Sequence, residues 1–156
     1  MVRVTYVGLG SRDAAVSAFD ALRPHVLMIR ALQARCWPWS PDDKALQIAI
    51  EGLEDAAYHF TRRPFYFEPT RVERQHGQNF YEGLGERPAA IAAFESLTPY
   101  ARALGALQQR CRPFGRDYLA LDIPRLCLDS AAYHFTKAAH FYGAKADSAG
   151  PIRRWP

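Results

Sequence analysis

The sequence contains the same segment twice. Residues 6–61 recur at 81–136 with a constant offset of 75 and no gap, and 28 of the 56 aligned positions are identical. The longest identical block, Ala-Ala-Tyr-His-Phe-Thr, occupies residues 56–61 and returns at residues 131–136. Such an internal duplication restricts the fold to one that two similar units can build together. It also lets each position be compared with its counterpart in the other half.

The size of the chain favours a single domain. A chain of 156 residues buries about 70% of its unfolded surface and needs no disulfide or metal to fold, whereas one half alone would be marginal. We therefore predict one domain over residues 1–156, with repeat one at 1–75, repeat two at 76–150 and a short C-terminal tail at 143–156. The simplest arrangement packs the repeats about a pseudo-twofold axis around a shared core.

Charge and cysteine content limit the partners and the compartment. The formal net charge of +4 is spread along the chain, whereas nucleic-acid-binding proteins usually concentrate basic residues in a stripe, so nucleic acid is not the expected partner. Cys36, Cys111 and Cys127 show no CxxC spacing, and an odd number suits a reducing compartment. No long apolar run is present. We expect a cytoplasmic protein without a membrane segment.

Each half begins with a predicted pair of helices. The first helix follows a Gly-Leu-Gly turn and shows the three-and-four spacing of apolar residues that is typical of a helix. Pro24 and Pro99 then either kink this helix or start a new one in its first turn, and Thr98 as a cap favours a new start. The middle helix is expected to end near Cys36 and Cys111.

The third helix of each half is the longest. Ser40 is a natural N-cap, Pro41 suits the first helical position, and the acids that follow are favourable at that end of the dipole. Pro124 is expected to delay or kink the start of the counterpart. The predicted ends are Thr61 or Arg63 in the first half and Lys137 or Ala139 in the second.

The remaining segments do not change the fold class. Residues 64–78 are irregular, with two prolines and a glycine among aromatic and charged residues, and are interpreted as a connection between the repeats. Val2 to Val7 could form a short strand. We predict an all-α fold in which two tandem helical repeats of about 75 residues pack as one pseudo-twofold helical bundle.

One arc of the long helix is expected to form the core. At 100° per residue, Leu46, Ala49, Leu53, Ala57 and Phe60 share a face with Ile50 at its edge, whereas Tyr58 points away. Tyr58 and its counterpart Tyr133 then contact the connection between repeats, another subunit or partner, or a ligand to which they offer a hydroxyl.

The shared histidines have two interpretations. His59 and His134 fall on the shoulder of the core arc near a helix C-terminus, where an imidazole bonds a carbonyl and interacts favourably with the dipole. Alternatively, the two approach each other across the pseudo-twofold axis as metal, haem or acid–base groups. Since HExxH and other dense ligand spacings are missing, we assign no metal or other cofactor.

Three further shared features have ordinary structural explanations. Arg12 and Arg87 follow the glycine turns, where free N–H groups at a helix start could hold a phosphate or carboxylate; a plain glycine turn is the alternative. Asp42 and Asp117 are interpreted as helix caps. The cysteines are interpreted as small buried apolar residues rather than reactive thiols.

The halves differ in the middle helix. The first half reads Val-Leu-Met-Ile at residues 26–29 where the second reads Ala-Arg-Ala-Leu, so the first is more apolar than one buried face requires. We expect this helix to be buried centrally or to form a homodimer contact, extended by Trp37 and Trp39. The aromatic group at residues 65–67 forms another surface or lines a pocket.

These observations favour a binding protein over an enzyme. The sequence shows no serine elbow, no paired carboxylates and no complete nucleotide loop. We expect a non-catalytic helical module that binds a protein partner, including a second copy, or an aromatic or apolar small molecule at the repeat junction. The alternative is a small metalloprotein or enzyme that uses the paired histidines and tyrosines. The candidate binding residues are Arg12, Trp37, Trp39, Tyr58, His59, Arg87, Tyr133 and His134.

Overall fold

The computed structural model describes residues 5–68 and 81–143, and these residues form six α-helices. The first half contains α1 (Arg12–Asp20), α2 (Arg23–Ala34) and α3 (Pro41–Thr61). The second contains α4 (Arg87–Glu95), α5 (Thr98–Gln109) and α6 (Arg116–Thr136). The described ranges contain no strand, so the all-α prediction is confirmed for them. Of the strand expected at residues 2–7, residues 2–4 lie outside the described ranges and residues 5–7 are not a strand.

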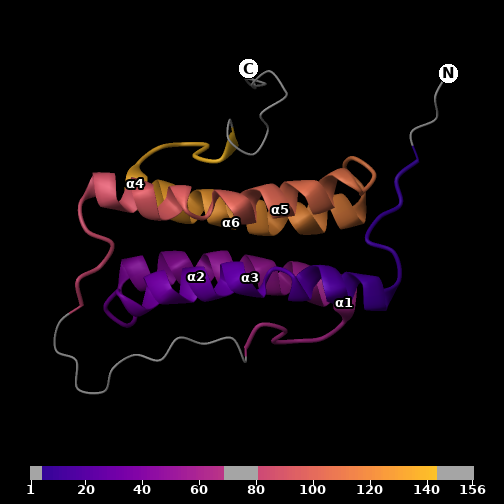
Figure 1. Ribbon diagram of the computed structural model, residues 1–156, viewed down its shortest axis with the longest axis horizontal. Coiled ribbons are helices and arrows are strands. Elements are labelled where there is room, and N and C mark those ends of the chain that lie inside the picture. Colours follow the sequence, from indigo (N-terminus) through magenta and orange to yellow (C-terminus); the bar gives the residue numbers. More distant parts are fainter. Residues whose placement is uncertain (1–4, 69–80, 144–156) are drawn as a thin grey trace.

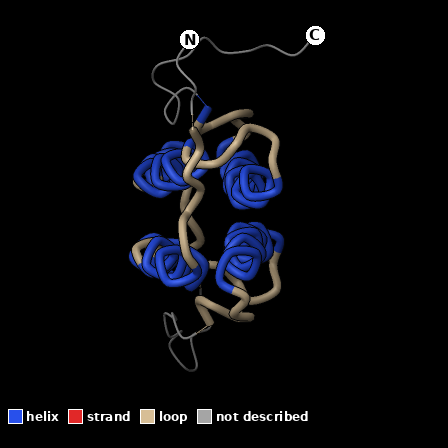
Figure 2. The backbone as a smooth tube through the Cα atoms, turned by 90° about the vertical axis from the view of Figure 1, so that its right-hand side faces the viewer, coloured by secondary structure: helices blue, strands red, loops and turns tan. Residues whose placement is uncertain are grey.

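The helices form two stacked layers with their axes roughly parallel. In Figure 1, α1, α2 and α3 make the lower layer and α4, α5 and α6 the upper one. The view of Figure 2 looks nearly along the helix axes and shows the same stacking end-on. Within each layer the two shorter helices pack on the long helix, and the most extensive contact joins the layers through α3 and α6. No helix in the described residues combines the length and apolarity needed to span a bilayer.

Side-chain caps set the starts of α1 and α3. Ser11 accepts a hydrogen bond from the Ala14 N–H at 3.2 Å, and Ser40 accepts one from the Asp43 N–H at 3.2 Å. The Asp43 carboxylate in return accepts the Trp39 N–H at 2.7 Å, which completes a reciprocal cap. The predicted cap at Ser40, with Pro41 in the first turn, is therefore confirmed.

Pro24, Pro99 and Pro124 act differently in their helices. Pro24 and Pro99 stand in the first turns of α2 and α5, so the predicted new starts are confirmed. Thr98 is not a cap, because α5 begins at Thr98 itself and Leu97 is the capping residue, without a side-chain hydrogen bond. Pro124 lies buried inside α6 and does not delay its start.

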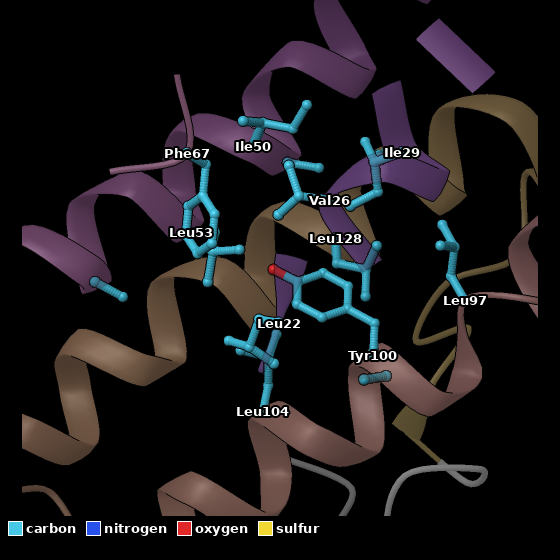
Figure 3. Packing of buried hydrophobic residues seen from close by; sticks show 14 of the residues in the cluster. Leu22, Val26, Ile29, Ile50, Leu53, Phe67, Leu97, Tyr100, Leu104 and Leu128 are labelled. Atoms are coloured by element: carbon cyan, nitrogen blue, oxygen red, sulfur yellow. The ribbon is translucent and has the colours of Figure 1, made fainter. Parts of the chain in front are cut away.

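The core is continuous between the layers. Leu46, Ala49, Leu53 and Ala57 are buried as predicted, whereas Ile50 is fully buried rather than at an edge and Phe60 is only partly buried. Figure 3 shows side chains of both halves meeting in this cluster, with Tyr100 of α5 close to Leu22 and Val26 of the first half and to Leu128 of α6. The halves thus share one apolar interior.

The middle helix of the first half is not buried on all sides. Val26 and Ile29 face the core with no exposed surface, whereas Leu27 and Met28 keep 44% and 38% of theirs. The expectation of central burial was wrong for these two residues, because an α-helix on the outside of a two-layer bundle has one covered face. A homodimer contact through Leu27 and Met28 stays a prediction.

After each long helix the chain folds back onto its own half. The Phe67 N–H donates to the Glu54 carboxylate at 2.6 Å, and at the positions 75 residues later the Tyr142 N–H donates to Asp129 at 3.3 Å. Of the aromatic residues 65–67, only Phe65 is exposed; the other two are buried in the core. They therefore serve packing rather than the surface or pocket that was expected.

Candidate functional site

Two histidine–aspartate pairs join the long helices of the two halves. His59 Nε2 lies 2.8 Å from Asp117 Oδ1, and His134 Nε2 lies 2.7 Å from Asp42 Oδ1. Each histidine is at the C-terminal end of its helix and each aspartate in a first turn, so α3 and α6 run antiparallel. The imidazoles and carboxylates are partly exposed. Each pair therefore closes one end of the contact between α3 and α6.

This geometry changes three interpretations of the shared polar residues. The histidines bond carboxylates of the opposite half rather than carbonyls, and Asp42 and Asp117 bond the histidines rather than capping helices. Since α3 carries one pair at each end and rises about 1.5 Å per residue, the two histidines lie about 25 Å apart. They do not approach each other, so a site that needs both imidazoles cannot form within this chain.

The side chains that could bind a metal are also dispersed. Residues 5–68 and 81–143 bring together no cluster of three or more histidine, cysteine or acidic side chains that could hold a metal ion. Cys36 and Cys111 are buried, with their sulfurs 3.6 Å from carbonyls one turn earlier in their helices, and Cys127 is partly buried. Burial raises the pKa of the Cys111 and Cys127 thiols, which disfavours the reactive thiolate.

The glycine turns serve contacts between the halves. The Gly8 N–H donates to the Arg110 carbonyl and the Gly83 N–H to the Arg35 carbonyl, each at 2.8 Å. Both glycines have positive φ, 63° and 67°, a conformation that other residues rarely adopt. These N–H groups are thus not free for a phosphate. Arg87 donates to the Thr136 carbonyl at 2.7 Å, which supplies a structural role for that residue, while Arg12 lies in the first turn of α1.

The shared tyrosines lie beside cations at the ends of the long helices. Tyr58 and Tyr133 keep 49% and 51% of their surface exposed. The Arg62 guanidinium lies 5.9 Å from the Tyr58 ring centre, and the Lys137 ammonium lies 5.8 Å from that of Tyr133. Each cation is on the left-handed residue that ends the helix. Cation–π contact accounts for the ring at both positions while leaving much of it open to a partner.

Positions 75 residues apart touch each other at the centre of the bundle. The His25 and Tyr100 rings stack with centres 5.5 Å apart. A Cβ added to Gly52 would lie 2.8 Å from the Cys127 sulfur. Burial raises the pKa of Tyr100, whose hydroxyl has no hydrogen-bond partner in the described part of the chain. The centre of the junction is therefore closely packed.

The outer face of α6 carries an apolar stripe. Leu119, Ile123, Leu126 and Tyr133 keep 48%, 41%, 59% and 51% of their surface exposed, on the side opposite the buried residues of the helix. Their spacing of four, three and seven residues places them in one row. Phe114, 74% exposed, precedes the helix. We call these five residues the α6 stripe.

In the first half, the face of α3 that corresponds to the α6 stripe borders a groove. The groove lies between α2 and α3, has a volume of about 810 Å³, and includes Arg30, Gln33, Trp39, Lys44 and Glu51 in its lining. Trp39 is 82% exposed. Trp37, 52% exposed, lies outside the lining and contacts Tyr81 with ring centres 4.9 Å apart.

Sequence reasoning missed two features for which a signal existed. Asp42 and Asp117 are retained at matching positions although most of their neighbours differ, which indicated a shared role beyond capping but not the residues they contact. The α6 stripe was visible as leucines at positions where the first half has Lys44 and Glu51.

Comparison with known protein families, curated proteins and solved structures finds no match to this chain.

Proposed function

We propose that this chain is a non-catalytic helical module that binds a protein partner through the α6 stripe. One observation carries the proposal: α6 is apolar on two opposite faces, one in the core and one in solvent. A helix on the surface of a bundle needs only the first of these faces to fold. An exposed apolar row is typical of a surface that another molecule covers.

The comparison of α3 with α6 supports this interpretation. Positions 119, 123, 126, 130 and 133 of α6 alternate in steps of four and three, the spacing of a coiled-coil seam. The matching positions in α3 carry Lys44, Ile48, Glu51, Asp55 and Tyr58. The folded core therefore tolerates charges on this face, and leucine at 119 and 126 serves something other than packing inside the chain. A partner helix with a similar apolar row, including α6 of a second copy, fits this spacing.

The proposal includes the arrangement of the halves as two repeats about a pseudo-twofold axis within one domain. Its support is that contacts between the halves occur in matching pairs. His59 bonds Asp117, and His134 bonds Asp42 at the equivalent positions of the other half. In the same way, each glycine turn bonds the end of the middle helix of the opposite half. A twofold rotation exchanges every such pair. The free cysteines support a reducing, cytoplasmic location as part of the same proposal.

The other functions considered for this chain have less support. A small molecule at the repeat junction would need space where Gly52 and Cys127 pack closely. A metalloprotein or enzyme that uses the paired histidines would need them to converge, whereas each is bonded to an aspartate at its own end of the bundle. An absorption spectrum and elemental analysis of the purified protein test the metal and haem versions directly.

The test of the α6 stripe replaces its leucines with the residues of α3. The variant Leu119→Lys/Leu126→Glu leaves the net charge unchanged and uses residues that the equivalent helix already tolerates. We expect the variant to fold with an unchanged far-UV circular dichroism spectrum. Any self-association of the wild type in light scattering should be lost in the variant, and proteins that can be cross-linked to the wild type at stripe positions should not be cross-linked to the variant.

The matched control is Ile48→Lys in α3, which adds a charge to the equivalent face of the other half and should leave binding intact. Equal association or capture by the stripe variant and the wild type would refute the proposal. So would a wild type that stays monomeric and is cross-linked to no protein through the α6 stripe.

A further inference from the structure

The groove between α2 and α3 is a second site, distinct from the α6 stripe. We infer that it binds a short free peptide, about three residues long, in an extended conformation with both termini charged. The site differs from the proposed protein interface in location, chemistry and occupant, so either can fail without the other.

The size and position of the groove suit a small ligand. Its volume of about 810 Å³ falls in the range of small-molecule sites. It is bounded by α2 on one side, by α3 on the other and by the turn that contains Trp39 at one end. It lies wholly within the first half, away from the closely packed junction.

The floor of the groove is a fixed polar array. Arg30 Nη1 donates to the side-chain oxygens of Gln33 and Gln47, each at 2.8 Å, and the Gln33 amide donates to the same Gln47 oxygen at 2.9 Å. Gln33 is 8% exposed. Because these side chains hold one another, they present amide and guanidinium groups in a set geometry, which reduces the ordering cost of binding a polar chain such as a peptide backbone.

The wall formed by α3 has opposite charges at its two ends. Lys44 lies in the first turn of α3, which follows the turn that contains Trp39, and Glu51 lies two turns further along the helix; Glu68 also joins the lining. Seven residues of helix separate the two α3 charges by about 10 Å. An extended chain advances about 3.3–3.6 Å per residue, so the termini of a tripeptide span the same distance. The carboxylate would meet Lys44 and the ammonium Glu51.

The aromatic end of the groove is held in place by the backbone. Trp39 has a φ of 66°, and its N–H is bound by the Asp43 carboxylate, so the turn directs an exposed indole to the edge of the groove. An indole there can cover an apolar side chain of the ligand next to its C-terminus.

The second half does not reproduce this arrangement. The positions that match Arg30, Lys44, Gln47 and Glu51 carry Gly105, Leu119, Asp122 and Leu126. There the retained glutamine, Gln108, is bonded instead by Arg125, which occupies the position of Ile50. Both halves thus bond the glutamine to a guanidinium, whereas only the first half has the charged pair along its long helix. The opposite charges at 44 and 51 belong to the groove.

The experiment measures binding of trialanine by the fluorescence of Trp39. Trp37→Phe and Trp155→Phe leave Trp39 as the only tryptophan. We expect a saturable change in its emission as trialanine is added up to about 10 mM. At this concentration a complex with a Kd of about 1 mM is about 90% formed. N-acetyl-trialanine and trialanine amide each lack one charged terminus and should bind at least about fivefold more weakly. Dialanine should also bind more weakly, because its termini cannot reach both charges.

Two variants assign the binding to the groove. Lys44→Leu and Glu51→Leu introduce the residues of the second half at exposed positions, and each should weaken trialanine binding while the thermal unfolding midpoint stays within a few degrees. Arg116→Leu, which removes one exposed positive charge from the start of α6, outside both sites, is the control and should bind as the parent does. The inference is overturned if trialanine gives no saturable response, if the blocked peptides bind as well as the free one, or if the two groove variants bind like the parent.

Discussion

A methyl group at position 52 tests whether the two long helices touch at matching positions. A Cβ at Gly52 would lie 2.8 Å from the Cys127 sulfur, 2.9 Å from its Cβ and 3.3 Å from the Pro124 Cα. The last atom is backbone, so a rotamer change in Cys127 alone cannot make room. Gly52→Ala must therefore separate α3 from α6 or distort one of them, and overpacking of this kind costs about 1–3 kcal/mol.

The helix propensity of alanine opposes this cost and must be measured separately. Gly105 lies in the interior of α5, and among residues 5–68 and 81–143 no neighbouring side chain or packed helix lies within 4 Å of a Cβ added there. Gly105→Ala should therefore stabilise the protein by about 1 kcal/mol through propensity alone. The difference between the two variants then isolates the overpacking. We expect Gly52→Ala to be less stable than Gly105→Ala by about 1–3 kcal/mol.

Urea unfolding followed by circular dichroism at 25 °C gives both free energies of unfolding. A double-mutant cycle adds Cys127→Gly, which removes the two nearest atoms and should recover at least about 1 kcal/mol of the cost at position 52. If Gly52→Ala stabilises the protein as much as Gly105→Ala does, the close contact between α3 and α6 is refuted. Absence of coupling with Cys127→Gly would show that the cost arises elsewhere.

The ion pairs, buried tyrosines and cysteines give three further predictions. A double-mutant cycle on His59 and Asp117 by urea unfolding should give a coupling of about 0.5–1 kcal/mol, as expected for a partly exposed pair, and zero coupling would count against the pair. Burial raises the pKa of Tyr66 to about 12, and raises those of Tyr100 and Tyr142 as well. Since these folded-state pKa values exceed the unfolded value of about 10, the stability they contribute is present below pH 10 and is lost as the pH rises toward 12. Absorbance at 295 nm should therefore show exposed tyrosines ionising first and buried ones only on unfolding; a single ionisation near pH 10 would contradict this. The thiols of Cys36 and Cys111, 1% and 2% exposed, should react with a disulfide reagent only after unfolding, and a fast native reaction of all three cysteines would show otherwise.

Much of the local structure could be predicted because its causes lie close together in the chain. The start of α3 depends on Ser40 and Pro41 and the start of α2 on Pro24, all of which act within one turn. The core face of α3 follows from the helical period at Leu46, Ala49 and Leu53. Central burial, one of the two alternatives expected for the middle helix of the first half, was wrong at Leu27 and Met28, because periodicity gives the apolar content of a helix but not how many of its faces are covered.

The candidate sites depend on contacts between residues far apart in the chain, which could not be predicted from the sequence. His59 and Asp117 are 58 residues apart, and Gly8 and Arg110 more than 100, so no local pattern joins them. The retained residues included Tyr58 and both histidines, whose side chains make the contacts described above. They could not show that Tyr58 contacts the neighbouring Arg62 or that the histidines lie at opposite ends of the bundle.

The sequence by itself determined the helical class, the starts of the capped helices and the correspondence between positions 75 residues apart, because hydrophobic period, capping and identity can be read along one dimension. Only the tertiary structure decided that α3 and α6 run antiparallel, which places each histidine against the aspartate of the other half and packs Gly52 on Cys127. A duplicated sequence is compatible with several ways of packing two units. The direction of packing is chosen by the fit of side chains across the interface, and that fit exists only in three dimensions.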